Sequence, residues 1–354
     1  MASIPVEHPA GGRLIAGSLA DPARAIGGPR FDAFFFWGAP LVAAASVWAW
    51  VLAATAMPAP LGKDAIGLLV YAVVVLTFAH LVAVVPRAYL NPQVFADNRR
   101  RLTVVPLLLV AGLSLSPVLL VCGAVLAVLW DVHHSAMQTF GIGRIYDMKS
   151  GNGPHVLRGT DLRLNWALYV GPIAAGASLL AHFESFAGFG RIDWALLASA
   201  PGVVAGNAEP IRYAAIAAWS AALLWSIRDY RAAAAAGYRM PAHKAALFGS
   251  TGAVSILAWG IAPPFVAFAI INLFHAVQYF ALVWLKEGER LTGAFGRGRH
   301  RALSLALFLA LCGGFGLAYA ATEKTSLLIA PFVACSLLHF WFDSFVWSVR
   351  KKQV

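Results

Sequence analysis

Apolar runs long enough to cross a lipid bilayer follow one another along almost the whole chain. A transmembrane helix needs about 20 predominantly apolar residues, and a backbone inside lipid must satisfy its own hydrogen bonds. We expect about ten spanning helices, at about 32–56, 64–86, 102–116, 118–141, 163–182, 210–227, 244–262, 263–286, 302–321 and 325–348. The sequence therefore predicts an all-α, polytopic membrane helical bundle over 32–349, between an irregular amino-terminal tail (1–31) and a short basic tail (350–354).

Two pairs of these runs meet at proline. Ser116-Pro117 joins the third run to the fourth, and Pro263-Pro264 joins the seventh to the eighth. Proline cannot donate a backbone hydrogen bond inside a helix, whereas it suits the first turn of a new one. We therefore expect each pair to form a tight helical hairpin.

Composition excludes a water-soluble domain and argues against a nucleic-acid partner. Hydrophobic residues make up 60% of the chain and charged residues 12%, against roughly 45–50% and about 25% in soluble domains. The formal net charge is +11, but the basic residues lie in short loops between apolar runs rather than on one soluble face. That placement is typical of membrane topology and of contact with anionic lipid headgroups.

The same basic residues predict an orientation. Twenty-three of them fall in the tails and the alternate loops of one side, and four, Lys63, Arg191, Arg212 and Lys324, fall on the other. Loops rich in lysine and arginine stay in the cytoplasm. We therefore expect both termini in the cytoplasm, in an integral protein of a bacterial inner membrane.

Five of the ten histidines lie inside predicted spans, where an ionisable side chain is costly and usually functional. They are His80, His133, His134, His275 and His339. All four spans that carry them run from the outer side to the inner side, and each histidine lies about six to eleven residues from the inner boundary. At about 1.5 Å of rise per residue, these side chains fall in one layer of the cytoplasmic half.

Carboxylate and amide side chains accompany the histidines at helical spacing. Asp343 follows His339 by four residues, and Gln278 follows His275 by three. Such neighbours serve as ligands or orient an imidazole through its second nitrogen. We predict a metal site with the ligands His80, His133, His134, His275, His339 and Asp343. The candidate catalytic residues at this site are His134, Asp343, Gln278 and Tyr279.

Neutral imidazoles with a carboxylate suit iron or zinc better than copper(I). Because His133 and His134 are adjacent, their side chains point about 100° apart on a helix, so both need not bind one ion. The iron centre is therefore left open between mononuclear and dinuclear. One of the two histidines then binds a second ion or orients the substrate.

Aromatic and basic residues near the layer suggest a hydrophobic substrate. Trp130, Phe274 and Trp341 offer an apolar lining for a molecule that arrives sideways from the bilayer. Arg87 and Arg144 follow the second and fourth spans, where a guanidinium group can hold a phosphate or an acidic headgroup. Membrane topology explains these two arginines equally well.

The arrangement of histidines on separate spans is similar to that of a known family. His80, His133, His275 and His339 resemble the iron ligands of the bacterial Brp/Blh β-carotene dioxygenases, which are all-helical membrane enzymes. The resemblance implies non-haem iron, dioxygen and a polyene or another long apolar substrate. The chain departs from the family pattern at His339-x-x-x-Asp343 and at the His133-His134 pair, and it has no HxxxH on a late span.

More distantly, the His133-His134 pair resembles a fragment of the histidine boxes of membrane fatty-acid desaturases and hydroxylases, whose full HxxxH and HxxHH boxes are absent. Both resemblances imply oxygen chemistry on a membrane lipid or an isoprenoid. The implied partners are that substrate, dioxygen and, for some reactions, an electron-donor protein.

Two other functions fit the same residues. Pairs of these histidines are also the axial ligands that haem b needs between helices in a membrane electron-transfer protein. Alternatively, Asp131, Asp343 and the histidines form a relay for protons or ions in a coupled transporter. The sequence alone leaves these alternatives open beside the oxygenase.

Overall fold

The structure is a computed structural model that describes residues 14–295, 300–322 and 327–347. Within these residues it is an all-α protein, with one short parallel pairing of β1 (Ile15–Ala16) and β2 (Met240–Pro241). The α-helices are α1 (Pro29–Phe35), α2 (Ala39–Ala56), α3 (Ala59–Leu81), α4 (Pro92–Leu115), α5 (Pro117–Lys149), α6 (Arg158–Ala175), α7 (Leu179–Phe183), α8 (Ala195–Ala198), α9 (Ala200–Gly206), α10 (Ala208–Ala235), α11 (Ala242–Ser255), α12 (Pro264–Ala294), α13 (Arg301–Ala321) and α14 (Ala330–Val346). Shorter 3-10 and π-helical turns extend some of these: η1 (Val82–Val84), η2 (Pro86–Leu90), η3 (Glu184–Ile192), η4 (Ile256–Ile261) and η5 (Leu327–Ile329).

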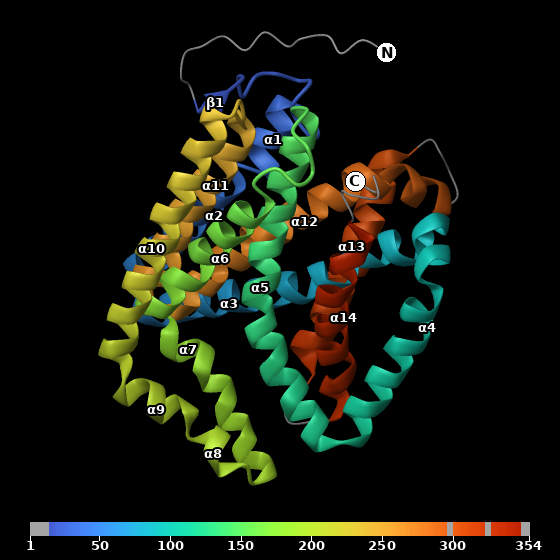
Figure 1. Ribbon diagram of the computed structural model, residues 1–354. Helices are drawn as coiled ribbons and strands as arrows, with labels where there is room; N and C mark the ends of the chain where they lie inside the picture. The colour runs from blue at the N-terminus through green and yellow to red at the C-terminus, as the bar shows by residue number, and fades with distance from the viewer. Residues whose placement is uncertain (1–13, 296–299, 323–326, 348–354) are drawn as a thin grey trace.

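Helices cover the predicted apolar runs, and the chain turns at both prolines, but the pairs are not the tight hairpins expected, because α4 and α5 diverge from their turn and α12 contacts the η4 end rather than the body of α11 (Figure 1). Ser116 caps α5 by accepting a hydrogen bond from the Leu119 amide, and Pro117 occupies the first turn. Pro264 opens α12 directly after the π-helical end of the preceding helix. Of the expected tails, 1–13 and 348–354 lie outside the described residues, and the segment from 14 to α1 contains only β1 and turns.

Six helices of the described chain are long and apolar enough to span a membrane: α2, α3 continued to Leu90, α5, α11 continued to Ile261, α12 and α13. The chain thus has the helices of an integral membrane protein. The expected span at 163–182 is broken, because α6 and the α7–η3 segment are bent by 100° and count at most as a seventh span. The break lies at Gly176, where a Cβ would meet the Gly260 Cα at 2.4 Å, so only glycine allows this approach to η4.

The remaining long helices are more polar or shorter than a regular span. α4 begins at Pro92 rather than near 102, and it kinks at Asn98 directly before Arg99, Arg100 and Arg101. α10 carries charged residues at both of its ends, and α14 has only 17 residues. The expected helices are therefore present, but their length and apolarity do not by themselves make each one a span.

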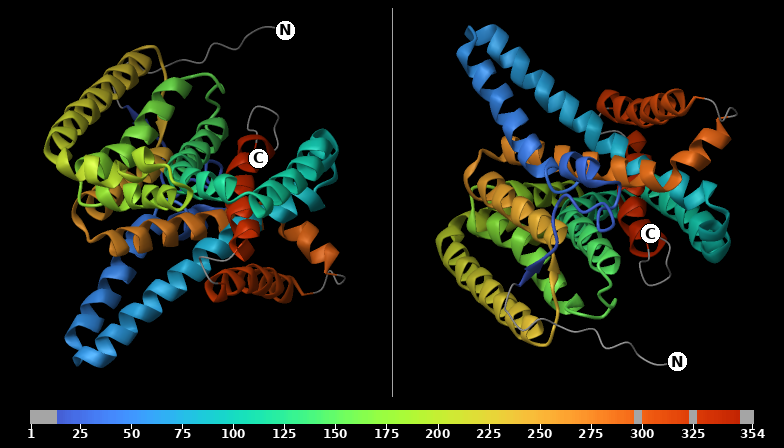
Figure 2. Two further views of the ribbon diagram at one scale, coloured as in Figure 1. Left: turned by 90° about the horizontal axis from the view of Figure 1, so that it is seen from below. Right: turned by 90° about the horizontal axis from the view of Figure 1, so that it is seen from above.

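α14 lies in the opening between α4 and α5, which diverge from their hairpin as the two arms of a V (Figure 1). The α2–α3 hairpin projects from the side of the molecule (Figure 2). α12 contacts α2, α3, α5 and α13, and its middle is almost entirely buried. Helices α3, α5, α12 and α14 therefore meet around one interior region.

A buried network of four charges fixes α5, α6 and α11 to one another. Lys244 Nζ lies 2.6 Å from Asp147 Oδ2 and 2.7 Å from Asp161 Oδ2. Arg144 Nη1 lies 2.6 Å from the same oxygen of each carboxylate. The Tyr238 hydroxyl donates to Asp147, and burial together with that carboxylate raises the pKa of Tyr238. The charges of the four side chains sum to zero, so the network is compensated although it is almost fully buried.

Replacing Lys244 with methionine leaves a buried carboxylate uncompensated, which costs about 3–5 kcal/mol. We expect Lys244→Met to lower the midpoint of thermal unfolding in detergent, and Lys244→Met with Asp161→Asn to recover part of the loss. The control is Arg212→Gln, which removes an exposed pair with Glu209 worth no more than about 1 kcal/mol. Equal midpoints for Lys244→Met and Arg212→Gln would contradict this role for the network.

Candidate metal centre

Three histidines from three helices bring their nitrogens together in the interior. His80 of α3, His134 of α5 and His339 of α14 each offer a ring nitrogen, and these atoms lie within 4.8 Å of one another. The three side chains are buried. His275 of α12 stands beside them, because its ring centroid lies 4.9 Å from those of His80 and His134. The expected histidine layer is thus a compact cluster contributed by four helices.

The proton on His339 can be placed from its partners. His339 Nδ1 lies 2.8 Å from the carbonyl oxygen of Leu81, which can only accept a hydrogen bond. Nδ1 therefore carries the proton, and Nε2 of the neutral ring presents a lone pair to the cluster. This is the arrangement in which a backbone carbonyl fixes the tautomer of a metal-binding histidine.

The two nearest imidazole nitrogens have the separation expected of ligands to one ion. His134 Nε2 lies 3.2 Å from His339 Nε2. Zinc–nitrogen bonds of about 2.1 Å at an angle near the tetrahedral value put two such ligands a little over 3 Å apart. Without an ion, the contact requires a proton on His134 Nε2; with an ion, both nitrogens are ligands. The geometry is compatible with either state.

The other two histidines make no hydrogen bond of standard geometry to a described residue, although the backbone carbonyls of Leu76 and Thr77 approach the His80 ring. Both ring nitrogens of His80 and of His275 are buried and unpaired within the described chain, although His80 is 0% exposed and His275 1%. Leaving a buried polar group unpaired costs about 1–3 kcal/mol. His243 is equally buried and unpaired away from the cluster, so it is the convergence of four imidazoles that favours an ion, and a bound ion removes part of the cost.

A carboxylate faces this cluster and is held from behind. Asp343 Oδ2 lies 3.8 Å from His134 Nδ1 and 3.8 Å from His339 Nε2. Its other oxygen accepts hydrogen bonds from the Tyr279 hydroxyl at 2.7 Å and from the Trp347 indole at 3.0 Å. One oxygen of Asp343 is therefore anchored, and the other is directed towards the imidazoles.

Arg87 supports the same carboxylate indirectly. Its guanidinium lies over the Trp347 ring, 4.9 Å from the centroid, and Nη1 contacts Glu287 Oε1 at 2.6 Å. Arg87 Nε also donates to the Val346 carbonyl at 3.0 Å. These contacts hold the end of α14, where Trp347 lies, against α12. Arg87 is buried in this packing rather than lining a substrate pocket.

Arg144, the second arginine expected at the substrate, belongs to the buried charge network. Besides its two carboxylates, it donates to the backbone carbonyls of Gly153, Pro154 and Val156. With these partners the guanidinium is fully engaged in fixing the α5–α6 connection. The structure therefore places Arg144 in the packing of the fold.

Two further expected residues lie outside the cluster. His133 is half-buried, and its ring packs 5.2 Å from that of Trp166 rather than among the other imidazoles. Gln278 donates to the Phe36 carbonyl at 2.9 Å and accepts from Gln138, which also donates to the His275 carbonyl. Gln278 therefore fixes the backbone of α12 around His275, while His133 faces a different side of α5.

The aromatic residues expected to line the substrate site pack in other places. Trp130 lies against Phe340, and Trp341 lies against Phe342 and Phe345. Phe274 is buried in the core that α12 forms with α2 and α11. None of these three residues lines the cavity described next.

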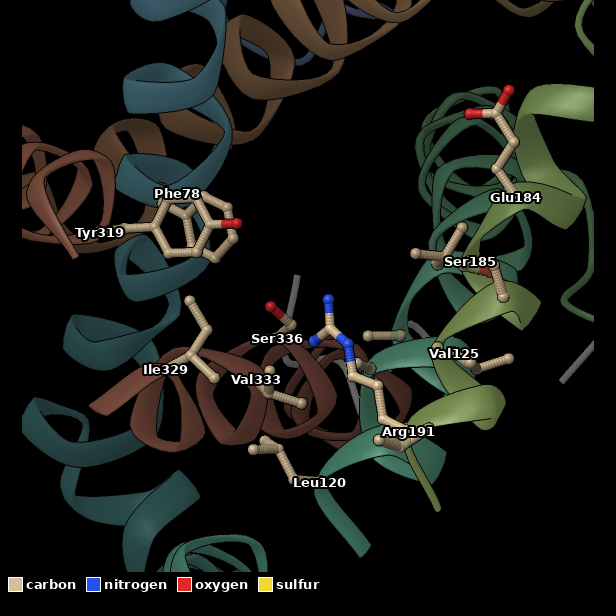
Figure 3. Close-up of a pocket in the computed structure, with 16 residues that line it drawn as sticks. Phe78, Leu120, Val125, Glu184, Ser185, Arg191, Tyr319, Ile329, Val333 and Ser336 are labelled. Carbon is tan, nitrogen blue, oxygen red and sulfur yellow. The ribbon is translucent and has the colours of Figure 1, made fainter. Parts of the chain in front are cut away.

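A cavity of about 570 Å³ is lined instead by residues that precede the histidines along α3, α5 and α14, together with residues of α13, η3 and η5. It is lined by Phe78, Leu120, Val121, Ala124, Val125, Ala127, Val128, Glu184, Ser185, Ala187, Gly188, Arg191, Tyr319, Ile329, Val333 and Ser336. No histidine of the described chain lines this cavity, but Phe78 precedes His80 by two residues and Ser336 precedes His339 by three, so the cavity and the cluster share helices α3 and α14. Figure 3 shows Phe78 stacked on Tyr319 at one wall and the Arg191 guanidinium directed into the space.

Sequence reasoning missed this cavity. The signal available was that Phe78, Val128 and Ser336 lie within two helical turns of a histidine on its outer side. The opposite wall comes from η3, which lies in the segment after the break at Gly176. Hydropathy does not predict where such a segment folds back.

No family model, curated protein or solved structure matches the chain. The case for any activity therefore depends on the geometry of the site.

Replacing His80 tests whether the cluster binds a metal ion or is only a set of packed imidazole rings. We expect His80→Leu to lose at least about tenfold in metal affinity, measured as metal per purified chain, because it removes a ligand. His133→Leu is the matched control on the same layer and should keep the metal content of the unchanged protein. Metal-free His80→Leu should be at least as stable as the unchanged protein, since it removes two orphaned nitrogens. Equal metal content in both variants would contradict the assignment.

Proposed function

We propose that the protein is an integral-membrane, non-haem iron-dependent oxidoreductase that uses dioxygen on a hydrophobic lipid or isoprenoid. The observation that carries the proposal is the convergence of four buried imidazoles. Neither ring nitrogen of His80 or of His275 makes a hydrogen bond of standard geometry within the described residues. Three of the helices that carry these histidines also line an apolar cavity. His80, His134, His275 and His339 would hold the iron, with Asp343 as a further ligand or as the partner of His134.

Iron is favoured over other metals by the donor set, since several imidazoles with one carboxylate suit a redox-active iron with open positions. When bound, iron would supply the activation of dioxygen. The site as assigned needs one ion, so a mononuclear centre is proposed. His133 is left outside it because it packs against Trp166.

The protein's own contribution is positioning and the exclusion of water. The Leu81 carbonyl sets the tautomer of His339, and Tyr279 with Trp347 sets the direction of the free Asp343 oxygen. The cavity walls would bring an apolar substrate to the outer side of the cluster. Insertion of both oxygen atoms into the substrate needs no electron donor, whereas hydroxylation or desaturation needs an electron-donor protein.

Haem b and a transport relay are the alternatives. Axial ligands approach a haem iron from opposite faces, so the macrocycle must lie between them. The rings of His80, His275, His134 and His339 instead touch one another, with centroids 4.8–5.1 Å apart around the cluster. A proton or ion relay would use Asp343 and the same histidines, and a well-folded preparation without metal would favour it.

Removing one hydroxyl tests the role of the carboxylate. Tyr279→Phe deletes the donor to Asp343, and loss of such a supporting group costs about 10–100-fold in metal affinity or activity. The measurement is iron content and oxygen consumption in the presence of membrane lipid extract. Tyr89→Phe is the control, because its hydroxyl donates to the Leu102 carbonyl away from the cluster. The proposal is wrong if Tyr279→Phe and Tyr89→Phe both behave as the unchanged protein.

We also propose that about ten helices cross a bacterial inner membrane and that both termini are cytoplasmic. The distribution of basic residues supports this topology, and six of the helices have the length and apolarity that it needs.

Cysteine labelling tests this topology at two exposed positions. An impermeant maleimide should label Ser199→Cys in intact cells, because this residue lies after the fifth expected span on the outer side. It should label Arg99→Cys only after the membrane is permeabilised. The reverse pattern would overturn the orientation, and labelling of both sites in intact cells would overturn the span count.

A further inference from the structure

The cavity beside the histidines carries an unexpected charge at its outer end. Arg191 on η3 is one of only four basic residues on the side expected to face outwards. The preference for cytoplasmic lysine and arginine does not account for it. Its guanidinium points into the cavity, and it forms no ion pair within the described residues (Figure 3).

The rest of the cavity is suited to a single apolar chain. Its walls are mainly aliphatic and aromatic side chains from α3, α5, α13 and α14. A volume of about 570 Å³ lies within the range of about 300–1,000 Å³ that small-molecule pockets occupy. Glu184 at the other end of η3 directs its carboxylate away from the Arg191 guanidinium, so the two do not neutralise each other.

The position of Arg191 relative to α5 follows from the contacts of η3. Gly188 of η3 lies against Val121 near the start of α5, and Arg191 follows one turn later. Ser336 and Phe78, which also line the cavity, are within three residues of cluster histidines. Thirteen residues separate Val121 from His134, or about 20 Å along a helix.

Because a guanidinium that forms no ion pair within the described residues enters a mainly apolar cavity (Figure 3), we infer that the cavity binds a single-chain amphiphile by its anionic end group. Arg191 holds the carboxylate or phosphate at the outer end, and the chain extends towards the histidines. A guanidinium makes two parallel hydrogen bonds to either group, which is why it discriminates an anion from a neutral ester. Building on the proposed function, the distal part of the chain, rather than the part next to the head group, is then presented to the metal.

The test measures binding and so does not depend on turnover. The full chain is placed in nanodiscs of phosphatidylcholine, and energy transfer from its tryptophans to cis-parinaric acid, a fluorescent single-chain fatty acid, is titrated. We expect saturable binding, which Arg191→Gln weakens at least about tenfold, the loss of one charge-assisted contact. Arg191→Lys should retain most of the affinity, and Arg212→Gln on the same side should leave it unchanged. Parinaric methyl ester should bind the unchanged protein more weakly and be insensitive to Arg191→Gln.

Variants that fill the cavity test the binding site without changing the charge of Arg191. Val333→Trp or, in a second variant, Ala127→Phe should abolish binding of both the acid and the ester. Displacement of the probe by oleate assigns a carboxylate head group and displacement by farnesyl monophosphate assigns a phosphate; either supports the inference. The inference is overturned if neither compound displaces the probe. It is also overturned if the acid and the ester bind with equal affinity, or if Arg191→Gln binds the probe as tightly as the unchanged protein does.

Metal content measured on the same samples separates this inference from the proposed function. Protein that contains iron but does not bind the probe overturns the cavity assignment alone. Protein that binds the probe but contains no metal overturns the iron centre, while the amphiphile site stands.

Discussion

The cost of placing four imidazoles in an apolar interior is the constraint around which the molecule is organised. Two of these rings, His80 and His275, have no hydrogen-bond partner within the described chain, in a region where water is scarce. Each orphaned nitrogen lowers stability, and the penalty grows as the local dielectric falls. An ion shared by several nitrogens removes it. On the proposed function, α3, α5, α12 and α14 would enclose such an ion.

The fold supplies this enclosure through two rigid supports on either side of the cluster. The network of Lys244, Arg144 and their two carboxylates locks α5 to α6 and α11. Arg87 and Glu287 lock the end of α14 to α12. A metal site needs ligands held in place before the ion binds, and these contacts immobilise the helices that carry them.

The sequence predicted the histidine layer because depth in a membrane is set by position along a helix. Similar distances from the expected inner boundary, about six to eleven residues, predicted that His80, His134, His275 and His339 lie near one level, and α14 carries Asp343 one turn from His339. The approximate positions of the helices were likewise predicted from apolar runs and prolines. These are local properties of the chain.

The features that sequence reasoning missed depend on contacts between distant segments. Adjacent His133 and His134 differ only in which neighbour each faces, and that is decided by the placement of α6 and α14 around α5. Arg144 looked available because its partner Asp161 lies on another helix and its backbone acceptors lie in the loop after α5. The outer cavity depends on the bend at Gly176, which returns η3 to α5. No periodicity or local spacing encodes these three outcomes.

The central claim is that these four imidazoles bind one ion, and X-ray absorption at the iron edge of the purified protein tests it most directly. The account predicts a first shell of nitrogen and oxygen atoms near about 2.1 Å, with the outer-shell scattering of several imidazoles. That scattering should diminish in His80→Leu and not in His133→Leu. A shell containing sulfur, the planar nitrogen set of a haem, or a well-folded protein with no metal would contradict it.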